Sequence, residues 1–535
     1  MPSSKPNFLF IMTDQHRADH IGSYGNSVIA TPNIDSIATN GLSFDKFYVS
    51  SPICMPNRAT LMTGRMPSIN GLLTNGLSLP WNSNTFVNVL KQAEYHTALV
   101  GKSHLQNMIN FRVEDWNYPP VSGGLPLHDD YNDAYLNTRS GKEYQNERLD
   151  LFKQNPDREV MLPYYGFEYV RFANGHGDSV GGHYTRWIHE QHENFGSLVG
   201  PENQLPGNNY IAPQAWRTAV PEELHSTAYV ESSTIEYLEK YAASDDDNPF
   251  FIQASFPDPH HPFVPPGKYW EMYDPADCPV PDAFGHEQND PPPLQRELER
   301  QYKNHEREIR VAAYVVNEQE IRESIALTYG MISFVDDAIG RILNKLRQLG
   351  LDDKTVVVFT SDHGDLMGDH GLMLKHCFHN DGLIRVPFLW SDPDSGHNGE
   401  RTDLLGGTID IASTILGRAG LAPYHGIQGF DVVDAVSKGT DLPRLGILVE
   451  EDEIPFNANC GQYLKTRTFV TERWRLTYWL EHCFGELYDR HNDPLELNNL
   501  WNDPLAHADK SLLLEMMMRE RFSLDEMSPK AEFCA

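Results

Sequence analysis

The stretch Asn7-Phe-Leu-Phe-Ile-Met-Thr13 is apolar between its ends, and Asp14 and Gln15 follow it directly. Its apolar residues are continuous, which is typical of a strand buried on both faces of a parallel sheet. Three more apolar runs end in polar residues in the same way. They are residues 97–100 before Gly101, Lys102 and His104, residues 249–256 before Asp258, His260 and His261, and residues 355–360 before Asp362 and His363. Because ligands bind beyond the carboxyl ends of such strands, the four polar clusters are expected to meet at one edge.

Helices are expected between these strands, at Thr85–Ala93, Pro221–Ala242 and Ile321–Leu349. In the last segment apolar residues recur at helical spacing, and Gly350 follows as a C-terminal cap. Apolar strands that alternate with helices predict an α/β fold. We therefore expect a large, mostly parallel central sheet flanked by helices.

The C-terminal part of the chain has a different pattern. Thr468–Leu480 alternates partly between apolar and polar residues, as antiparallel strands do. This predicts a catalytic α/β domain over residues 1–425 and a small C-terminal α+β domain, on a short antiparallel sheet, with its tail over residues 426–535. Two segments, about 106–207 and 272–310, break the alternation and are interpreted as insertions that shape a cleft.

Composition narrows the function classes. The 535 residues include 43 Lys and Arg against 75 Asp and Glu, a net charge of −32, which argues against binding to nucleic acid or to anionic membranes. No apolar run approaches the roughly 20 residues of a membrane span, and no secretory leader is evident, so a cytoplasmic protein is expected. The six cysteines form no CxxC pair and are expected to be reduced.

One motif stands out in the segment Ser51–Arg65. It combines Cys54, Pro56 and Arg58 in the pattern CxPxR, followed by a TGR ending. Further motifs follow in order along the chain. They are GKxH at 101–104, PHxP at 259–262, SDHG at 361–364 and GELYD at 485–489.

These motifs and their order resemble the formylglycine-dependent sulfatases and phosphonate monoester hydrolases of the alkaline phosphatase superfamily. The resemblance implies that a separate modifying enzyme oxidises Cys54 to formylglycine. One hydroxyl of its hydrate would attack the ester and form a covalent sulfo-enzyme, and the second would expel sulfate as the aldehyde re-forms. The residues after Cys54 are expected to be helical, so that backbone N–H groups favour an anion there and Arg58 points back at the same site.

The resemblance also implies a cation site. Asp14, Gln15, Asp362 and His363 would bind one divalent ion together with the residue 54 hydroxyl (Cys54 before oxidation). Carboxylate and amide oxygens favour Ca²⁺, whereas the imidazole makes Mn²⁺ an alternative. Many sulfatases carry Asp in place of Gln15 and Asn in place of His363. The pair found here resembles phosphonate monoester hydrolases and choline sulfatases, which leaves the metal and the preferred ester open.

The remaining candidate residues would handle charge and protons. Lys102 and Lys375 would neutralise the ester oxygens and give the local positive charge that an anionic substrate needs. By resemblance, His104 would help to deprotonate the hemiacetal, and His260 with Lys375 would assist the leaving oxygen. Asp362 would take the proton from the attacking hydroxyl.

A few positions are less specific. Asn75 is expected to line the substrate pocket, and His261 could replace His260 because the two are adjacent. The glycine-rich stretches Asn174–Gly177 and Gly181–His183 lack phosphate-loop spacing and are interpreted as turns.

The sequence thus predicts a metal-dependent sulfatase that hydrolyses sulfate monoesters of aryl or small alkyl alcohols and tolerates phosphonate and phosphate esters. One alternative is a phosphonate monoester hydrolase or phosphodiesterase of the same family. Another is a non-catalytic anion-binding relative with unmodified Cys54. The expected partners are a small anionic ester, the modifying enzyme in passing and further copies of the chain, to which the tail at 516–535 could contribute.

Overall fold

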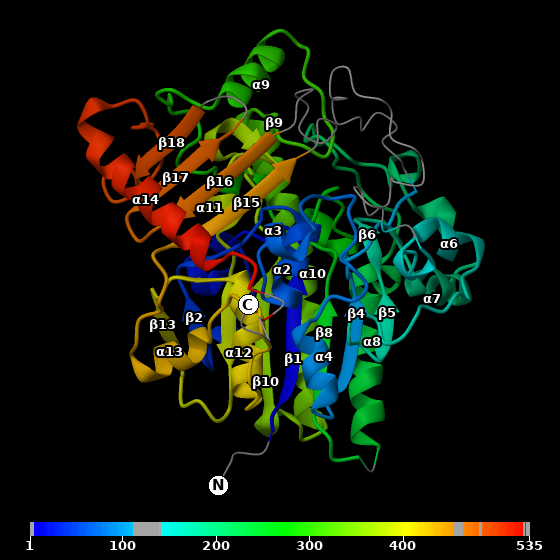
Figure 1. The fold of residues 1–535 in the computed structure, drawn as a ribbon. Helices are drawn as coiled ribbons and strands as arrows, with labels where there is room; N and C mark the ends of the chain where they lie inside the picture. Colours follow the sequence, from blue (N-terminus) through cyan, green and yellow to red (C-terminus); the bar gives the residue numbers. More distant parts are fainter. Residues whose placement is uncertain are drawn as a thin grey trace, which may run out of the picture.

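The computed structural model describes residues 5–110, 139, 141–244, 246–453, 464–480, 484–527 and 530. Within them, the main feature is an eight-stranded sheet that is parallel except at β12 (Figure 1). Its strands, in spatial order, are β13 (Glu400–Thr402), β2 (Leu42–Phe44), β12 (Phe388–Ser391), β10 (Thr355–Ser361), β1 (Asn7–Thr13), β8 (Phe250–Ser255), β4 (His96–Gly101) and β5 (Tyr169–Phe172).

The four strands that the sequence predicted are confirmed, and they are neighbours at the centre of this sheet. They lie in the order β10, β1, β8, β4, and all three pairings are parallel. Thr13 pairs with Ser361, and Gly101 pairs with Ser255, so the strands end at nearly the same level. The polar residues that follow each strand are therefore brought to one edge.

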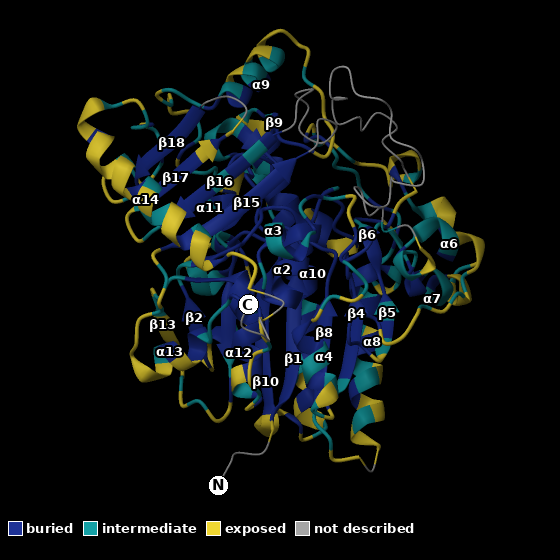
Figure 2. Cartoon of the chain, in the orientation of Figure 1, coloured by how far each residue is buried: buried dark blue, intermediate teal, exposed yellow. Residues whose placement is uncertain are grey.

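Helices cover both faces of the sheet, because side chains of a buried strand alternate between the faces. Leu9 and Ile11 pack with residues of α1 (Pro32–Thr39), α8 (Ser226–Ala242) and α10 (Glu318–Gln348). Phe8 and Phe10 pack on the other face, against α2 (Cys54–Thr63), α4 (Phe86–Gln92) and α12 (Ile411–Arg418). Figure 2 shows the central strands buried between these layers.

The three predicted helices are confirmed as α4, α8 and α10, with shifted starts. In α10 the start is at Glu318, because Asn317 and Glu320 form a capping box in which each side chain accepts the other's backbone N–H. A short 3₁₀ turn, Glu222–Leu224, precedes α8, which begins only at Ser226.

The predicted short antiparallel sheet is also present. It contains β15 (Ile447–Glu453), β16 (Leu464–Val470), β17 (Trp474–Trp479) and β18 (Phe484–Asp489) in sequence order, and α14 (His507–Ser523) packs on it through Leu513. In Figure 1 this sheet lies beyond the carboxyl ends of the central strands, near α2. The domain boundary at residue 425 stays a prediction.

The segment 106–207 is more structured than an inserted loop. Its described part includes the edge strand β5, which pairs in parallel with β4, and a hairpin of β6 (Asn174–His176) and β7 (Ser179–Gly181).

The other short helices, along the described part of the chain, are α3 (Pro67–Asn70), α6 (Leu149–Gln154), α7 (His183–Gln191), α9 (Pro293–Lys303), α11 (Asp381–Ile384) and α13 (Val432–Lys438). Two pairs of short strands also form: β3 (Phe47–Tyr48) pairs with β14 (Gly406–Gly407), and β9 (Tyr314–Val315) pairs with β11 (Leu372–Met373). None of the described helices combines the length and apolar character needed to cross a membrane.

Candidate active site

The ends of two central strands and the start of α2 bring four reactive side chains into one buried cluster. One ligand atom from each of Asp14, Cys54, Asp362 and His363 lies within 4.8 Å of the others. Asp14 and Asp362 follow neighbouring strands, and the Asp362 N–H donates to the backbone oxygen of Thr13 at 3.3 Å. The sheet edge at which the sequence placed these groups is thus where they meet.

Cys54 is the first residue of α2, so the expected helix start is confirmed. Its Sγ lies 3.0 Å from Nε2 of His363, 3.0 Å from Nζ of Lys375 and 3.8 Å from Oδ1 of Asp14. Burial and the Asp14 charge raise the pKa of the thiol, but Lys375, His363 and Lys102 outweigh them and bring the pKa below its ordinary value. The surroundings of residue 54 therefore favour an anionic atom.

Arg58 lies one turn along α2 and holds both aspartates of the cluster. Its Nε donates to Oδ2 of Asp362 at 2.7 Å, and Nη2 donates to Oδ2 of Asp14 at 3.3 Å. Its Nη1 donates to the backbone oxygen of Lys102 at 3.0 Å and to Oγ of Ser255 at 3.1 Å. The guanidinium does point back into the cluster, where it fixes the two carboxylates and the ends of two strands.

Lys102 supplies a second buried cation beside Asp14. Its fully buried Nζ forms an ion pair with Oδ2 of Asp14 and lies 2.6 Å from Nε2 of His176. Burial raises the pKa of Asp14, but Lys102 and Arg58 more than offset this and hold that pKa well below its usual value. The two cations therefore favour the ionised form of Asp14.

Lys375 contacts both residue 54 and His260. Its Nζ lies 3.0 Å from Nε2 of His260 and 3.0 Å from Nε2 of His363. The Nδ1 of His260 lies 2.6 Å from the backbone oxygen of His261, so Nδ1 carries the hydrogen and Nε2 accepts from the lysine. Lys375 and His260 thus form a proton-donating pair whose lysine lies within hydrogen-bond distance of residue 54.

The loop that carries Lys375 is held by the small sheet. Its neighbours Leu374 and His376 have left-handed backbones, with φ of 67° and 91°. From β15, Glu453 lies 2.8 Å from Nδ1 of His376, and Glu451 accepts the Cys377 N–H at 2.8 Å. Burial lowers the pKa of His376, but the two glutamates raise it to about 9, so the imidazole is charged at neutral pH. β15 thereby stabilises a loop conformation that is otherwise unfavourable.

Gln15 is buried directly after Asp14, and its amide nitrogen and amide oxygen differ in their contacts. Its Nε2 donates to Oδ2 of Asp365 at 2.5 Å and lies 3.0 Å from Nδ1 of His261. Its Oε1 is buried and has no hydrogen-bond partner among the described residues. A buried amide oxygen without a donor suits a cation, and the Gln15 N–H donates to Oδ1 of Asp362 at 3.1 Å, which places the residue next to the cluster.

His104 and Asn75 lie at the margin of the cluster. The His104 N–H donates to Glu147 at 2.8 Å, and its buried Nδ1 has no partner among the described residues. Burial and the charges of Lys102 and Arg58 hold the pKa of His104 well below its ordinary value, so it is a neutral imidazole. Asn75 accepts the Met55 N–H at 3.2 Å and so contacts the first turn of α2.

Sequence reasoning did not assign His176 or Asp365 to the site, and it held His261 only as an alternative to His260. The stretch Asn174–Gly177 does form the tip of a hairpin, but its His176 enters the cluster. Glycine spacing gave no signal for this, because the contact to Lys102 spans 74 residues. His261 was detectable from its position beside His260.

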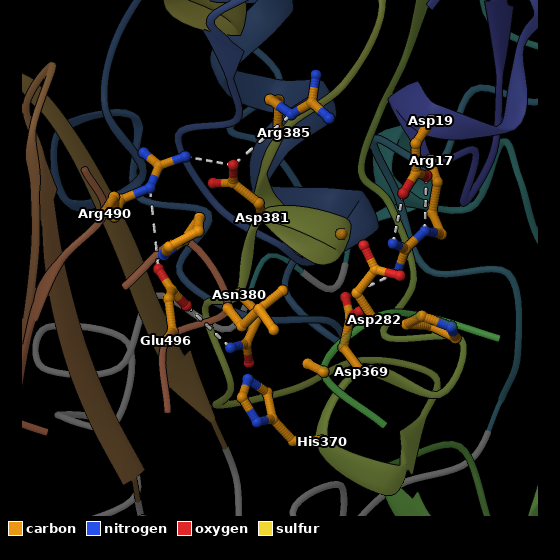
Figure 3. Close-up of a pocket in the computed structure, with 15 residues that line it drawn as sticks. Arg17, Asp19, Asp282, Asp369, His370, Asn380, Asp381, Arg385, Arg490 and Glu496 are labelled. Atoms are coloured by element: carbon orange, nitrogen blue, oxygen red, sulfur yellow. Dashed lines mark hydrogen bonds and ion pairs between the residues drawn. The ribbon is translucent and has the colours of Figure 1, made fainter. Parts of the chain in front are cut away.

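A separate pocket of about 160 Å³ is lined in part by Asp369 and His370, which follow Asp362 in the chain (Figure 3). Two of its arginines already form ion pairs: Arg17 pairs with Asp19 and Asp369, and Arg490 pairs with Asp381. No residue expected in the active site lines it. The pocket therefore adds no candidate reactive group.

Comparison with known proteins agrees with this geometry. The sulfatase family model matches residues 6–421, which is most of the chain. The chain belongs to the sulfatase family. It is therefore a sulfuric ester hydrolase. A second model, for the C-terminal part of N-sulphoglucosamine sulphohydrolase, matches residues 368–522 of this sulfatase.

Several characterised relatives resemble the sulfatase along nearly its whole length. It is 28% identical to an arylsulfatase of Clostridium perfringens, covering 96% of this chain and 95% of the relative. It is 25% identical to a choline-sulfatase of Rhizobium meliloti, covering 96% and 86%. The crystal structure of a phosphonate monoester hydrolase from Agrobacterium radiobacter shares the fold, with a TM-score of 0.73, 23% identity and coverage of 98% and 97%.

Proposed function

We propose that this sulfatase hydrolyses sulfate monoesters of aryl or small alkyl alcohols through a formylglycine at position 54. The observation that carries the proposal is the buried meeting of Cys54 with Asp14, Asp362 and His363, within contact of Lys375. A helix N-terminus and two buried lysines there supply the positive charge that a sulfate ester needs against a net charge of −32.

In this proposal the Sγ of Cys54 stands in for one hydroxyl oxygen of the formylglycine hydrate. That hydroxyl gives its proton to Asp362 as its oxygen attacks sulfur, the bond from sulfur to the leaving oxygen breaks, and the leaving oxygen takes a proton from the pair of Lys375 and His260. His104, a neutral imidazole, then takes the proton of the second hydroxyl as the aldehyde re-forms and sulfate leaves. Lys102 and Lys375 neutralise the non-bridging oxygens, and Asn75 borders the pocket.

A single divalent cation fits the same residues. Asp14, Gln15, Asp362 and His363 would hold it with the oxygen of residue 54, Ca²⁺ being our first choice and Mn²⁺ the alternative. When bound, the cation would acidify the hydroxyl of residue 54 and keep it in place. Asp362 would hold the cation as well as take the proton of the attacking hydroxyl, and its Oδ2 accepts from Nε of Arg58 at 2.7 Å.

Replacing Asp365 with Asn is expected to weaken cation binding roughly 10- to 100-fold. One Asp365 oxygen accepts the N–H groups of Met367 and Leu374, which an Asn oxygen can still do. The Asn amide would then face Gln15 as a donor and turn its amide around, so that Nε2 replaces Oε1 at the cation. Titration calorimetry with Ca²⁺ and with Mn²⁺ measures the change.

Asp369→Asn is the matched control, because Asp369 lies in the same loop and pairs with Arg17 without touching Gln15. Its cation affinity should equal that of the unaltered protein. Equal affinities for all three proteins would show that Asp365 does not orient the amide.

The function is tested by two measurements on one preparation. Mass spectrometry of the tryptic peptide from Phe47 to Arg58 should show that the Cys54 side chain has exchanged H₂S for O. Values of kcat/KM for 4-nitrophenyl sulfate should exceed those for 4-nitrophenyl phenylphosphonate. A higher value for the phosphonate would favour the second candidate, a phosphonate monoester hydrolase, which the pair Gln15 and His363 also suits. A plain thiol in active protein would exclude the formylglycine route.

A further inference from the structure

His176 lies at the tip of a hairpin that is fixed between two loops of the site. Two residues earlier, the Asn174 side chain accepts the Ser103 N–H at 3.1 Å. Next to His176, Gly177 has φ of 54°, and a Cβ there would lie 2.7 Å from Cγ of Pro262. The hairpin is thus packed against both the GKxH and the PHxP segments, which leaves its tip little freedom to move.

The His176 side chain contacts both of those segments. Its Nε2 lies 2.6 Å from Nζ of Lys102, and its ring stacks on His260 with centroids 3.6 Å apart and planes at 16°. A lysine ammonium only donates, so Nε2 of His176 must be the acceptor and the ring must be neutral. Burial and the Lys102 charge both lower the pKa of His176, which keeps it neutral at working pH.

We propose that His176 is a positioning residue for ester hydrolysis, whose Nε2 holds the ammonium of Lys102 and whose ring face holds His260. This inference rests on the proposed function, from which the roles of Lys102 and His260 are taken. His176 itself is assigned no contact with substrate. It links the lysine that would neutralise the ester oxygens to the histidine that would serve the leaving oxygen.

Each contact has a separate consequence. Lys102 is shared between Asp14 and His176, so the imidazole supplies the second acceptor that keeps the ammonium directed into the site. The stack keeps the His260 ring in the plane in which its Nε2 meets Lys375. Loss of such positioning can cost about 100-fold in rate even where no reacting group is removed.

Two variants separate these contacts. His176→Gln retains an acceptor for Lys102 but removes the ring, whereas His176→Phe retains the ring and removes the acceptor. The holoenzyme of each is assayed with 4-nitrophenyl sulfate and with phenyl sulfate, whose leaving group is the poorer. Inhibition by inorganic sulfate reports the oxyanion site without any chemistry.

We expect His176→Phe to raise KM and the inhibition constant for sulfate roughly 10-fold or more, with an unchanged ratio of kcat between the two esters. We expect His176→Gln to lower kcat for phenyl sulfate several-fold more than for 4-nitrophenyl sulfate, with little change in sulfate inhibition. A merely structural role would lower kcat for both esters in the same proportion in both variants and would leave KM and sulfate inhibition unchanged.

His183→Gln is the matched control, because His183 is buried nearby and its Nδ1 accepts the Phe172 N–H at 2.9 Å, away from the cluster. It should leave the ratio of kcat values and the sulfate inhibition unchanged. The proposal is overturned if both His176 variants keep the wild-type pattern, or if both lower kcat for the two esters in the same proportion with unchanged KM and sulfate inhibition. If the unaltered protein prefers phosphonates, the proposed sulfate specificity fails, and the same comparison made with aryl phenylphosphonates still decides the role of His176.

Discussion

Replacing Cys54 with Ala is expected to abolish ester hydrolysis, with a fall in kcat/KM of roughly 10⁴- to 10⁶-fold. The physical reason is that residue 54 is the nucleophile of the proposed reaction, and Lys375 and His363 are arranged around its side-chain atom at 3.0 Å. Hydrolysis of 4-nitrophenyl sulfate at saturating Ca²⁺ measures the loss.

Cys54→Ser provides a sharper form of the same test. A serine has one hydroxyl, which can attack the ester but leaves no second hydroxyl to expel sulfate. The variant should therefore accumulate a sulfated residue 54, visible by mass spectrometry, without turnover. Cys278→Ala is the control, because Cys278 is also a free, buried cysteine but packs in a different part of the core. Substantial turnover by Cys54→Ala would refute the proposed nucleophile.

The second large effect is expected for Arg58→Ala, which should lower the free energy of unfolding by about 3–5 kcal/mol and remove measurable activity. Arg58 is 1% exposed and pairs with Asp14 and Asp362, both fully buried. Without it, two carboxylates lose the guanidinium that offsets their desolvation, although Lys102 still pairs with Asp14. Urea unfolding in the absence of divalent ions measures the change.

Arg519→Ala is the control for losing an arginine that is ion-paired. Arg519 and Glu515 are 69% and 59% exposed, and such a pair contributes about 0–1 kcal/mol. The cost of Arg58→Ala should also shrink when Ca²⁺ is added, because an ion bound between the carboxylates replaces part of the lost charge. Equal stabilities of the Arg58 and Arg519 variants would contradict this account.

Much of the fold was predictable because the central strands are long and continuously apolar. That pattern indicated a parallel sheet, and the parallel arrangement alone places Asp14, Lys102 and Asp362 at one edge. The edge strand β5 and the antiparallel strand β12 were not predicted. Each has only four residues, too few to distinguish from a loop by periodicity.

Short stretches of sequence were enough to locate the CxPxR segment at the start of a helix and the polar residues after each buried strand. Both features can be recognised locally, because they depend only on the spacing of residues that are near one another in the sequence. Other contacts became visible only in the folded chain. They are the hydrogen bond from the Gln15 amide to Asp365, the contacts of β15 with the Lys375 loop, and those of His176 with Lys102 and His260. The residues in those contacts are separated by 350 positions for Gln15 and Asp365 and by 74 for the pairs Cys377 with Glu451 and Lys102 with His176. No local sequence pattern indicates contacts between residues so far apart in the chain.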